Sequence, residues 1–260
     1  LHIAGDAVSS HVWGMTATVL VFVLAVFVLA GFAKGVIGLG LPTISMGLLA
    51  VVLPPAEAAA LLILPSLVTN VWQMVDGPQL RAVLRRLWPL NLGVCVGTWG
   101  GAAFLSGLGG PYGALALGVA LMVYAVSGLA ALKLAVPQRA EPWLGPLAGA
   151  VTGAITAATG VFVIPAVPYM QAIGLQKDAL VQALGLSFTV STLALAVNLA
   201  GDRAFTWELA WPSLAAVVIA LLGMRLGQAV RARLSPQTFR FWFFAGLLAL
   251  GAYLAARGLI

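Results

Sequence analysis

The chain has 260 residues, of which 62% are hydrophobic and 8% are charged, and its mean hydropathy is +1.07. An ordinary soluble domain is roughly half apolar and a quarter charged, so this composition excludes a water-soluble fold and predicts an all-α polytopic membrane protein. The net charge of +6 does not indicate nucleic-acid binding, because the basic residues are spread over short loops and form no basic stripe on a folded face.

Apolar stretches follow one another along nearly the whole chain. Each is near the roughly 20 residues that an α-helix needs to cross the hydrocarbon core of a bilayer. The short loops leave no soluble domain, so any function is expected inside the membrane bundle. We expect membrane helices over residues 15–36, 57–75, 87–106, 112–135, 143–159, 179–200, 207–230 and 237–258, with shorter apolar segments at 41–53 and 161–173.

Cysteine and histidine are too sparse for metal or redox chemistry in the bundle. Cys95 is the only cysteine, which excludes an internal disulfide and a cysteine-based metal cluster. His2 and His11 both precede the first span. The sequence therefore predicts no metal site and no cofactor, and without a recognisable catalytic pair it does not predict an enzyme. Residues 1–14 contain no Lys or Arg and so lack the basic start of a cleaved signal peptide.

The basic residues predict the orientation of the helices, because short cytoplasmic loops retain Lys and Arg. Ten of the 13 lie in or beside four loops on one predicted side, Arg203 and Arg257 lie on the other side, and Lys34 lies within a span. For this division to hold, the segment 15–53 must enter and leave on the outer side, and the segment 143–173 on the inner side. Each is then a helical hairpin, either two short helices or a broken re-entrant pair, and both termini are predicted on the non-cytoplasmic side.

The chain also shows an internal duplication. Trp88-Pro89 and Trp211-Pro212 are each followed twelve residues later by a glycine and then by a helix that opens with a proline. Each half has an odd number of crossings, so the second is expected to be inverted, as in many secondary transporters. The predicted repeats are 1–140, with hairpin 15–53 and helices 57–75, 87–106 and 112–135, and 141–260, with hairpin 143–173 and helices 179–200, 207–230 and 237–258.

Glycine and proline gather where each hairpin must reverse direction. Glycine adopts unusual backbone angles and permits close approach, whereas proline removes a backbone donor. A single glycine is equally consistent with close helix packing. Irregular backbone at membrane depth is tolerated only where protein or a water-filled cavity satisfies it, so the two clusters indicate a cavity. They are Gly31, Gly35, Gly38, Gly40 and Pro42 in the first hairpin, and Gly149, Gly153, Gly160 and Pro165 in the second.

Lys34 lies beside the first break, with no acidic residue within twenty positions on either side. Burying an ammonium group in a membrane costs about 2.5 kcal/mol or more, so Lys34 is expected to face a cavity or an anionic ligand. Alternatively, it extends to an interface or pairs with a distant carboxylate such as Glu57. Thr152 occupies the matching position in the second half.

Hydroxyl and amide side chains near the two breaks outline a polar chamber. Each one alone is more often an interhelical hydrogen bond than a ligand contact. Because the spans contain a clear Lys and no clearly central acid, the chamber is predicted to bind a small anion through hydroxyl, amide and backbone N–H donors. The predicted substrate-binding residues are Lys34, Gly35, Gly38, Gly40, Thr43, Ser66, Asn70, Gln73, Thr156, Thr159, Ser187 and Ser191.

The run AGFAKGVIGLGLP from Ala30 to Pro42, the turn PPAEA that begins at Pro54 and the second glycine-rich segment together resemble the sulfite exporter TauE/SafE family, also called the toluene sulfonate uptake permease group. The resemblance covers residues 20–258. It implies a bacterial inner-membrane permease for small sulfur-containing anions such as sulfite, sulfonates or sulfoacetate. Many relatives carry a richer glycine run where this chain has Leu39-Gly40-Leu41.

The expected mechanism is secondary transport with alternating access, in the direction of export because a negative interior expels anions. The expected partners are the anionic substrate, the lipid bilayer and a coupling ion, either a proton or sodium, and the sequence leaves the oligomeric state open. Two alternatives remain: a transporter of another small anion or a neutral solute, and a non-transporting membrane scaffold, for which a closed, dry interface between the hairpins would be expected.

Overall fold

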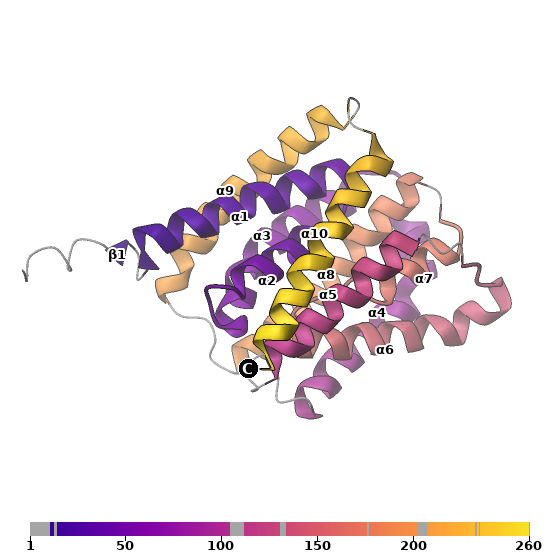
Figure 1. Ribbon diagram of the computed structural model, residues 1–260. Helices are drawn as coiled ribbons and strands as arrows, with labels where there is room; N and C mark the ends of the chain where they lie inside the picture. Colours follow the sequence, from indigo (N-terminus) through magenta and orange to yellow (C-terminus); the bar gives the residue numbers. More distant parts are fainter. Residues whose placement is uncertain are drawn as a thin grey trace, which may run out of the picture.

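The computed structural model describes residues 11–12, 15–104, 112–130, 134–175, 177–201, 207–231, 233 and 235–259. Ten α-helices dominate this part of the chain (Figure 1), preceded by a pair of two-residue antiparallel strands, β1 (His11–Val12) and β2 (Met15–Thr16). The predicted all-α fold class is confirmed. The helices are α1 (Ala17–Ile37), α2 (Leu41–Leu49), α3 (Pro55–Val75), α4 (Leu80–Phe104), α5 (Gly113–Ala130), α6 (Glu141–Thr159), α7 (Ala166–Ala172), α8 (Lys177–Gly201), α9 (Trp207–Val230) and α10 (Pro236–Arg257).

Six helices in the described ranges are long and apolar enough to cross a membrane: α1, α3, α5, α8, α9 and α10. The chain is therefore a multi-pass membrane protein, as its composition predicted. The sequence led us to expect eight such spans, and α4 and α6 are the two that fall outside the six. Both contain several glycines, and α4 begins with Arg81, Arg85 and Arg86, which lowers their mean hydropathy. Their packing against each other makes use of the glycines.

The first predicted hairpin consists of α1 and the short helix α2. The 21 residues of α1 span about 31 Å, enough to cross a bilayer, whereas the nine residues of α2 span about 14 Å. The chain reverses at Gly38 (φ 77°) and Gly40 (φ 111°), both in the left-handed region that favours glycine. The N–H of Gly38 donates to the carbonyl of Lys34 at 2.8 Å, which ends α1.

The second hairpin, formed by α6 and α7, ends its first helix in the same way. Gly160 has φ 70°, and its N–H donates to the carbonyl of Thr156. Beyond it, two threonines of α6 accept backbone N–H groups of the non-helical segment. The Oγ1 of Thr159 accepts from Val161, and the Oγ1 of Thr152 accepts from Ala166 at the start of α7. Side chains of the hairpin itself therefore satisfy part of its irregular backbone.

The helices pack in reciprocal pairs across the two halves of the chain. The main pairs are α1 with α9, α4 with α6, α3 with α8, and α5 with α10. The contacts of α1 and α9 advance together, Gly31 against Ala220 and Gly35 against Met224, so these helices run parallel. In contrast, α3 and α8 run antiparallel. The first helix of each hairpin, α1 or α6, thus packs against a helix of the other half, α9 or α4. Such reciprocal pairing is expected of two halves with opposite orientations, and it supports the proposed inverted repeat.

Glycines let the paired helices approach to backbone contact. A Cβ atom on Gly31 would lie 2.2 Å from the carbonyl oxygen of Ala220, and one on Gly97 would lie 2.0 Å from that of Ala150. Neither position has room for any side chain. Close packing through small residues is a main source of helix association in a bilayer, where apolar burial supplies little net drive. The crossings α1–α9 and α4–α6 therefore hold each hairpin to a helix of the other half.

The two crossings are similar in detail. Gly223 of α9 faces the carbonyl of Val28, ten residues before Gly38, and Gly97 of α4 faces that of Ala150, ten residues before Gly160. Measured from the glycine that ends the first helix of each hairpin, the two contacts therefore lie at the same place. Trp211 precedes Gly223 by twelve residues and Trp88 precedes Gly97 by nine, so the two Trp-Pro pairs differ by about one helical turn in the crossings.

Two arginines hold the ends of the hairpins. Arg86 forms an ion pair with Glu141 at 2.7 Å and donates to the carbonyl of Ile173 at 2.8 Å, which ties α4 to both ends of the second hairpin. Its hydrogen bond to Glu141 raises the pKa of Arg86 above the usual value, so the guanidinium stays charged. At the end of the first hairpin, Arg257 of α10 donates to the carbonyl of Val51 at 2.6 Å.

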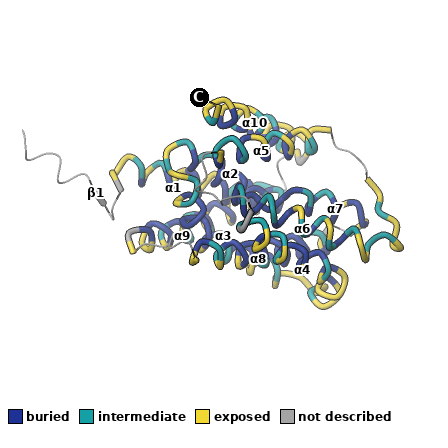
Figure 2. The backbone as a smooth tube through the Cα atoms, turned by 90° about the horizontal axis from the view of Figure 1, so that it is seen from below, coloured by how far each residue is buried: buried dark blue, intermediate teal, exposed yellow. Residues whose placement is uncertain are grey.

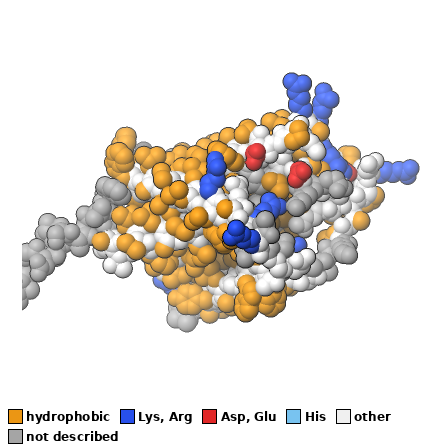
Figure 3. Space-filling view, turned by 90° about the horizontal axis from the view of Figure 1, so that it is seen from above, with side chains coloured by type: hydrophobic (Ala, Val, Ile, Leu, Met, Phe, Trp, Pro, Cys, Tyr) orange, Lys and Arg blue, Asp and Glu red, His pale blue; other side chains and the backbone are white. Residues whose placement is uncertain are grey.

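The most buried element is α2, in which all but one residue is buried. Buried residues concentrate around it and on the inner faces of α3 and α8, whereas the outer faces of α4, α5 and α10 are largely exposed (Figure 2). In the view of Figure 3, one part of the surface is almost entirely hydrophobic and most of the visible basic side chains lie over the other. A broad apolar surface with charges toward one end is expected of a protein surrounded by lipid.

We expect the substitution Gly97→Val to destabilise the protein by about 1–3 kcal/mol, because the added side chain must push α4 away from Ala150. Thermal unfolding in detergent micelles would measure the effect. Gly100→Val is the matched control in the same helix, since a Cβ on Gly100 would meet nothing within 4 Å. Equal loss of stability in both variants would show that helix propensity, and not the crossing, sets the cost.

Candidate functional site

Lys34 is 2% exposed and lies at the centre of a hydrogen-bonded cluster that joins three helices. Its Nζ donates to Thr69 Oγ1 at 3.3 Å and to Asn70 Oδ1, both on α3. Asn70 Nδ2 donates in turn to Thr192 Oγ1 on α8 at 3.3 Å. We call these four residues the Lys34 cluster. Within the described part of the chain Lys34 has no carboxylate partner, so the alternative pairing with Glu57 is not present.

Gln73, one helical turn beyond Asn70, stabilises the first break. Its Nε2 donates to the carbonyl of Gly38 at 3.1 Å and to the carbonyl of Val181 in α8 at 2.9 Å. The carbonyl of Gly38 lies where α1 ends and has no helical partner of its own. The side-chain amide of Gln73 therefore supplies a hydrogen-bond partner for the backbone at the break and connects the break to α8.

Several predicted residues bond only within or beside their own helix. Thr156, Thr159 and Ser191 each donate to the carbonyl four residues earlier, at 2.7 to 2.9 Å. Ser187 donates to the Sδ of Met170 at 3.8 Å. Hydroxyls that bond back to their own helix carry no information about a ligand. The hydroxyl donors of Thr156, Thr159 and Ser191 are therefore engaged by their own helices in this conformation, and that of Ser187 by the neighbouring α7.

Other predicted residues have hydrogen-bonding capacity that no described group uses. Thr43 and Ser66, together with the neighbouring Ser45, are fully buried, and their hydroxyls have no partner among the described residues. The Oε1 of Gln73 is likewise unpaired there. Buried polar atoms are paired in the great majority of cases. These groups, on α2 and α3, are therefore available to water or to a polar ligand.

The three predicted glycines of the first hairpin serve its geometry. A Cβ on Gly35 would lie 2.2 Å from the carbonyl oxygen of Met224, so Gly35 belongs to the α1–α9 crossing. Gly38 and Gly40 make the reversal, and a Cβ on Gly40 would come within 2.9 Å of the Phe243 ring. The structure thus brings Lys34, Asn70, Gln73 and these glycines together around the first break.

A cavity of about 580 Å³ lies beside this break, between the end of α1 and the second hairpin. None of the predicted substrate-binding residues lines it, although Ile37 and Leu39 on either side of Gly38 do. The remaining lining residues are Tyr124, Ser127, Gly128, Leu134, Val167, Pro168, Gln171, Ala172, Leu180, Val181, Leu184, Arg231, Arg240 and Phe244.

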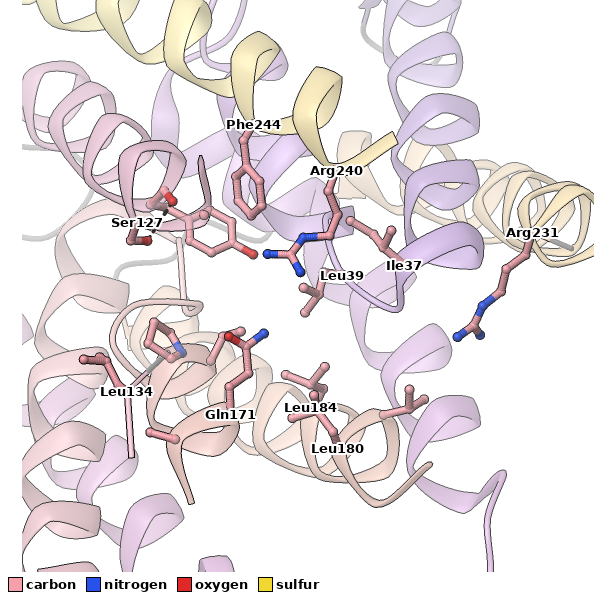
Figure 4. Close-up of a pocket in the computed structure, with 16 residues that line it drawn as sticks. Ile37, Leu39, Ser127, Leu134, Gln171, Leu180, Leu184, Arg231, Arg240 and Phe244 are labelled. Atoms are coloured by element: carbon pink, nitrogen blue, oxygen red, sulfur yellow. Dashed lines mark hydrogen bonds between the residues drawn. The ribbon is translucent and has the colours of Figure 1, made fainter. Parts of the chain in front are cut away.

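Each polar side chain of the cavity is able to donate a hydrogen bond. Arg231 and Arg240 are its charged lining residues, and no carboxylate lies among the described residues that line it. Arg240 lies 5.9 Å from the centre of the Phe244 ring, which packs edge-on against Tyr124 at 5.1 Å. The Tyr124 hydroxyl is buried and has no partner among the described residues. Figure 4 shows Arg240 and Gln171 pointing into the same space from opposite walls. This arrangement suits an anion.

Sequence reasoning missed the cavity residues. Arg231 and Arg240 were counted only as charges of a loop, and Gln171 was not considered. Tyr124 offered the one usable signal, since a phenol inside an apolar span requires a hydrogen-bond partner or a polar cavity. The convergence of five helices (α1, α5, α7, α8 and α10) on this space depends on long-range packing that no local pattern reveals.

One known protein family matches the chain. A family model described as Sulfite exporter TauE/SafE matches residues 23–254, nearly the whole chain. The chain belongs to the sulfite exporter TauE/SafE family. The resemblance seen in the glycine-rich run of the first hairpin is thereby confirmed, and TauE/SafE membership identifies the chain as a member of a family of membrane transporters. No significant match was found among curated proteins or among solved structures.

We expect Lys34 and Asn70 to be energetically coupled. Asn70→Leu leaves a buried ammonium with only Thr69 as a partner, so it should be more destabilising than Lys34→Met. The double variant should recover about 0.5–3 kcal/mol relative to the sum of the single effects. Thermal unfolding of the four proteins in one detergent would give this coupling energy, and strict additivity would contradict the contact.

Proposed function

We propose that this protein is a secondary transporter for small sulfur-containing anions such as sulfite, sulfonates or sulfoacetate, working by alternating access in a bacterial inner membrane. The observation that carries the proposal is the cavity between the hairpins, whose charged lining residues are both arginines. Membership of the TauE/SafE family supports the sulfur-containing class of substrate.

The donors of the cavity match an oxyanion. A guanidinium can bind two oxygens of a sulfite or sulfonate group at once, and such charge-assisted bonds are stronger than neutral ones. Arg240 is the proposed primary contact, with Arg231, the amide of Gln171 and the hydroxyl of Tyr124 as further donors. The apolar remainder of the wall, including Phe244 and Leu184, would accommodate the organic part of a sulfonate.

Lys34 is the proposed electrostatic anchor deeper in the bundle. Its hydrogen-bond partners are neutral, so its charge is not cancelled by a carboxylate among the described residues. Gln73 connects the break beside Lys34 to Val181, which lines the cavity. Movement at the first break would bring an anion toward Lys34 and the unpaired hydroxyls of Thr43 and Ser66, which remain proposed ligands of a second conformation.

The proposed orientation follows from the arginines. The cavity lies at the end of the bundle that carries Arg231 and Arg240, the side that retained basic residues assign to the cytoplasm. The described conformation is then open to the inside, both termini lie outside, and a negative interior favours export of the anion. A proton or sodium ion remains the proposed coupling partner.

The scaffold alternative would require a closed, dry interface between the hairpins. A cavity of about 580 Å³ with two arginines between them favours transport instead.

Arg240→Gln should weaken the apparent affinity for the transported anion at least tenfold, since a hydrogen bond to a charged group contributes about 1.5–3 kcal/mol. Counter-transport in liposomes with sulfite, taurine, sulfoacetate, thiosulfate and sulfate would measure this and identify the substrate. Arg233→Gln, at an exposed position outside the cavity lining, is the charge-matched control. No flux of any of these anions in the unmodified protein would refute the proposed function.

Lys34→Met should reduce the maximal rate of anion flux at least tenfold in protein that remains folded, because the apolar side chain keeps the volume but not the charge. Folding would be checked by the unfolding temperature of the same preparation. Unchanged flux of every tested anion would remove Lys34 from the proposed site.

A further inference from the structure

An outward-facing groove of about 350 Å³ lies along the α4–α6 crossing, separate from the transport cavity. It forms because glycines bring the two helices to backbone contact, while larger side chains project on either side. Its walls are almost entirely apolar. They consist of Trp88, Pro89, Leu92, Gly93 and Val96 from α4, and Pro142, Pro146 and Ala150 from α6.

Two arginines continue the same face of α4 beyond the groove. Successive members of the series Arg81, Arg85, Trp88 and Leu92 are four, three and four residues apart. Residues at these spacings lie on one side of an α-helix. Both arginines are exposed, and neither has a hydrogen-bond or ion-pair partner in the described ranges. The neighbouring Arg86 differs, because it is engaged with Glu141.

Two exposed tryptophans indicate where one end of the groove lies in the bilayer. Trp88 of α4 and Trp143 of α6 are each 61% exposed and lie near the starts of their helices, at the end that carries Arg81 and Arg85. Exposed tryptophans concentrate at the level of the lipid headgroups. The groove therefore begins at the headgroup layer and continues into the hydrocarbon.

We propose that this groove binds one anionic phospholipid, with the headgroup phosphate on Arg81 and Arg85 and an acyl chain along Leu92 and Val96. Basic residues beside a cleft between membrane helices are a recurrent arrangement for anionic headgroups. The apolar walls supply contact for the chain, and the guanidinium groups supply the charge complement. The groove shares no lining residue with the cavity proposed for the transported anion.

A second copy of the chain is the competing occupant. Membrane dimers related by a twofold axis along the membrane normal bring identical residues to the same depth. Arg81 and Arg85 of one copy would then face the same arginines of the other, which is repulsive. An anionic lipid neutralises these charges, so the charge pattern favours the lipid.

Native mass spectrometry of the purified full-length chain, equilibrated with equal amounts of phosphatidylglycerol and phosphatidylcholine, tests the proposal. We expect preferential retention of one phosphatidylglycerol, and a loss of about fivefold in that preference for each of Arg81→Gln and Arg85→Gln. Arg233→Gln, an exposed arginine away from the groove, should retain the preference. An equal loss in this control, or no preference in the unmodified protein, would overturn the site.

Two further arms exclude other occupants. Inorganic phosphate at the lipid's concentration should not displace phosphatidylglycerol, because it lacks the chain that fills the groove, and displacement would show a simple phosphate site. The mass spectrum also reports the oligomeric state. A dimer that excludes lipid and persists in the Arg81→Gln/Arg85→Gln variant would show that a second copy covers the groove.

Discussion

The whole arrangement depends on one constraint of the bilayer: backbone polar groups released by a broken helix need partners inside the protein. The helical backbone is interrupted in both hairpins, and side chains supply hydrogen-bond partners for several of the released backbone groups. Gln73 takes the carbonyl of Gly38, while Thr152 and Thr159 accept N–H groups beyond Gly160. Polar residues near the breaks therefore have a structural task before any ligand arrives. That task explains why several predicted ligands bond to backbone.

Much of the fold could be predicted from local features. Apolar stretches near twenty residues indicated the spans, and clustered glycines indicated the reversals, where Gly38 and Gly40 indeed adopt left-handed angles. For Lys34 the sequence predicts a cavity or an anionic ligand, and in the structure its ammonium is buried and donates to the neutral Thr69 and Asn70. The positions of spans and reversals could be predicted because each rests on a property of a short segment, either its length or its backbone freedom.

The cavity could not be predicted, since it arises from distant segments. Arg240, Gln171 and Tyr124 belong to α10, α7 and α5, and each looks ordinary in its own segment. The Trp-Pro pairs indicate the duplication in the sequence, whereas the contacts that α4 and α9 make with the hairpins are formed by glycines such as Gly97 and Gly223. Positions where two backbones come into contact are harder to recognise in a sequence than positions that require a particular side chain.

The exchange of partners between halves also has a consequence for biosynthesis. The glycine face of α1 packs against α9, so α1 is synthesised well before the helix with which it makes most of its contacts. Until α9 is inserted, the backbone at Gly31 and Gly35 lacks the helix against which it packs in the folded protein. The first hairpin is therefore synthesised long before its packing against α9 can be completed. Because α1 and α6 each pack against a helix of the other half, neither half completes its helix packing on its own.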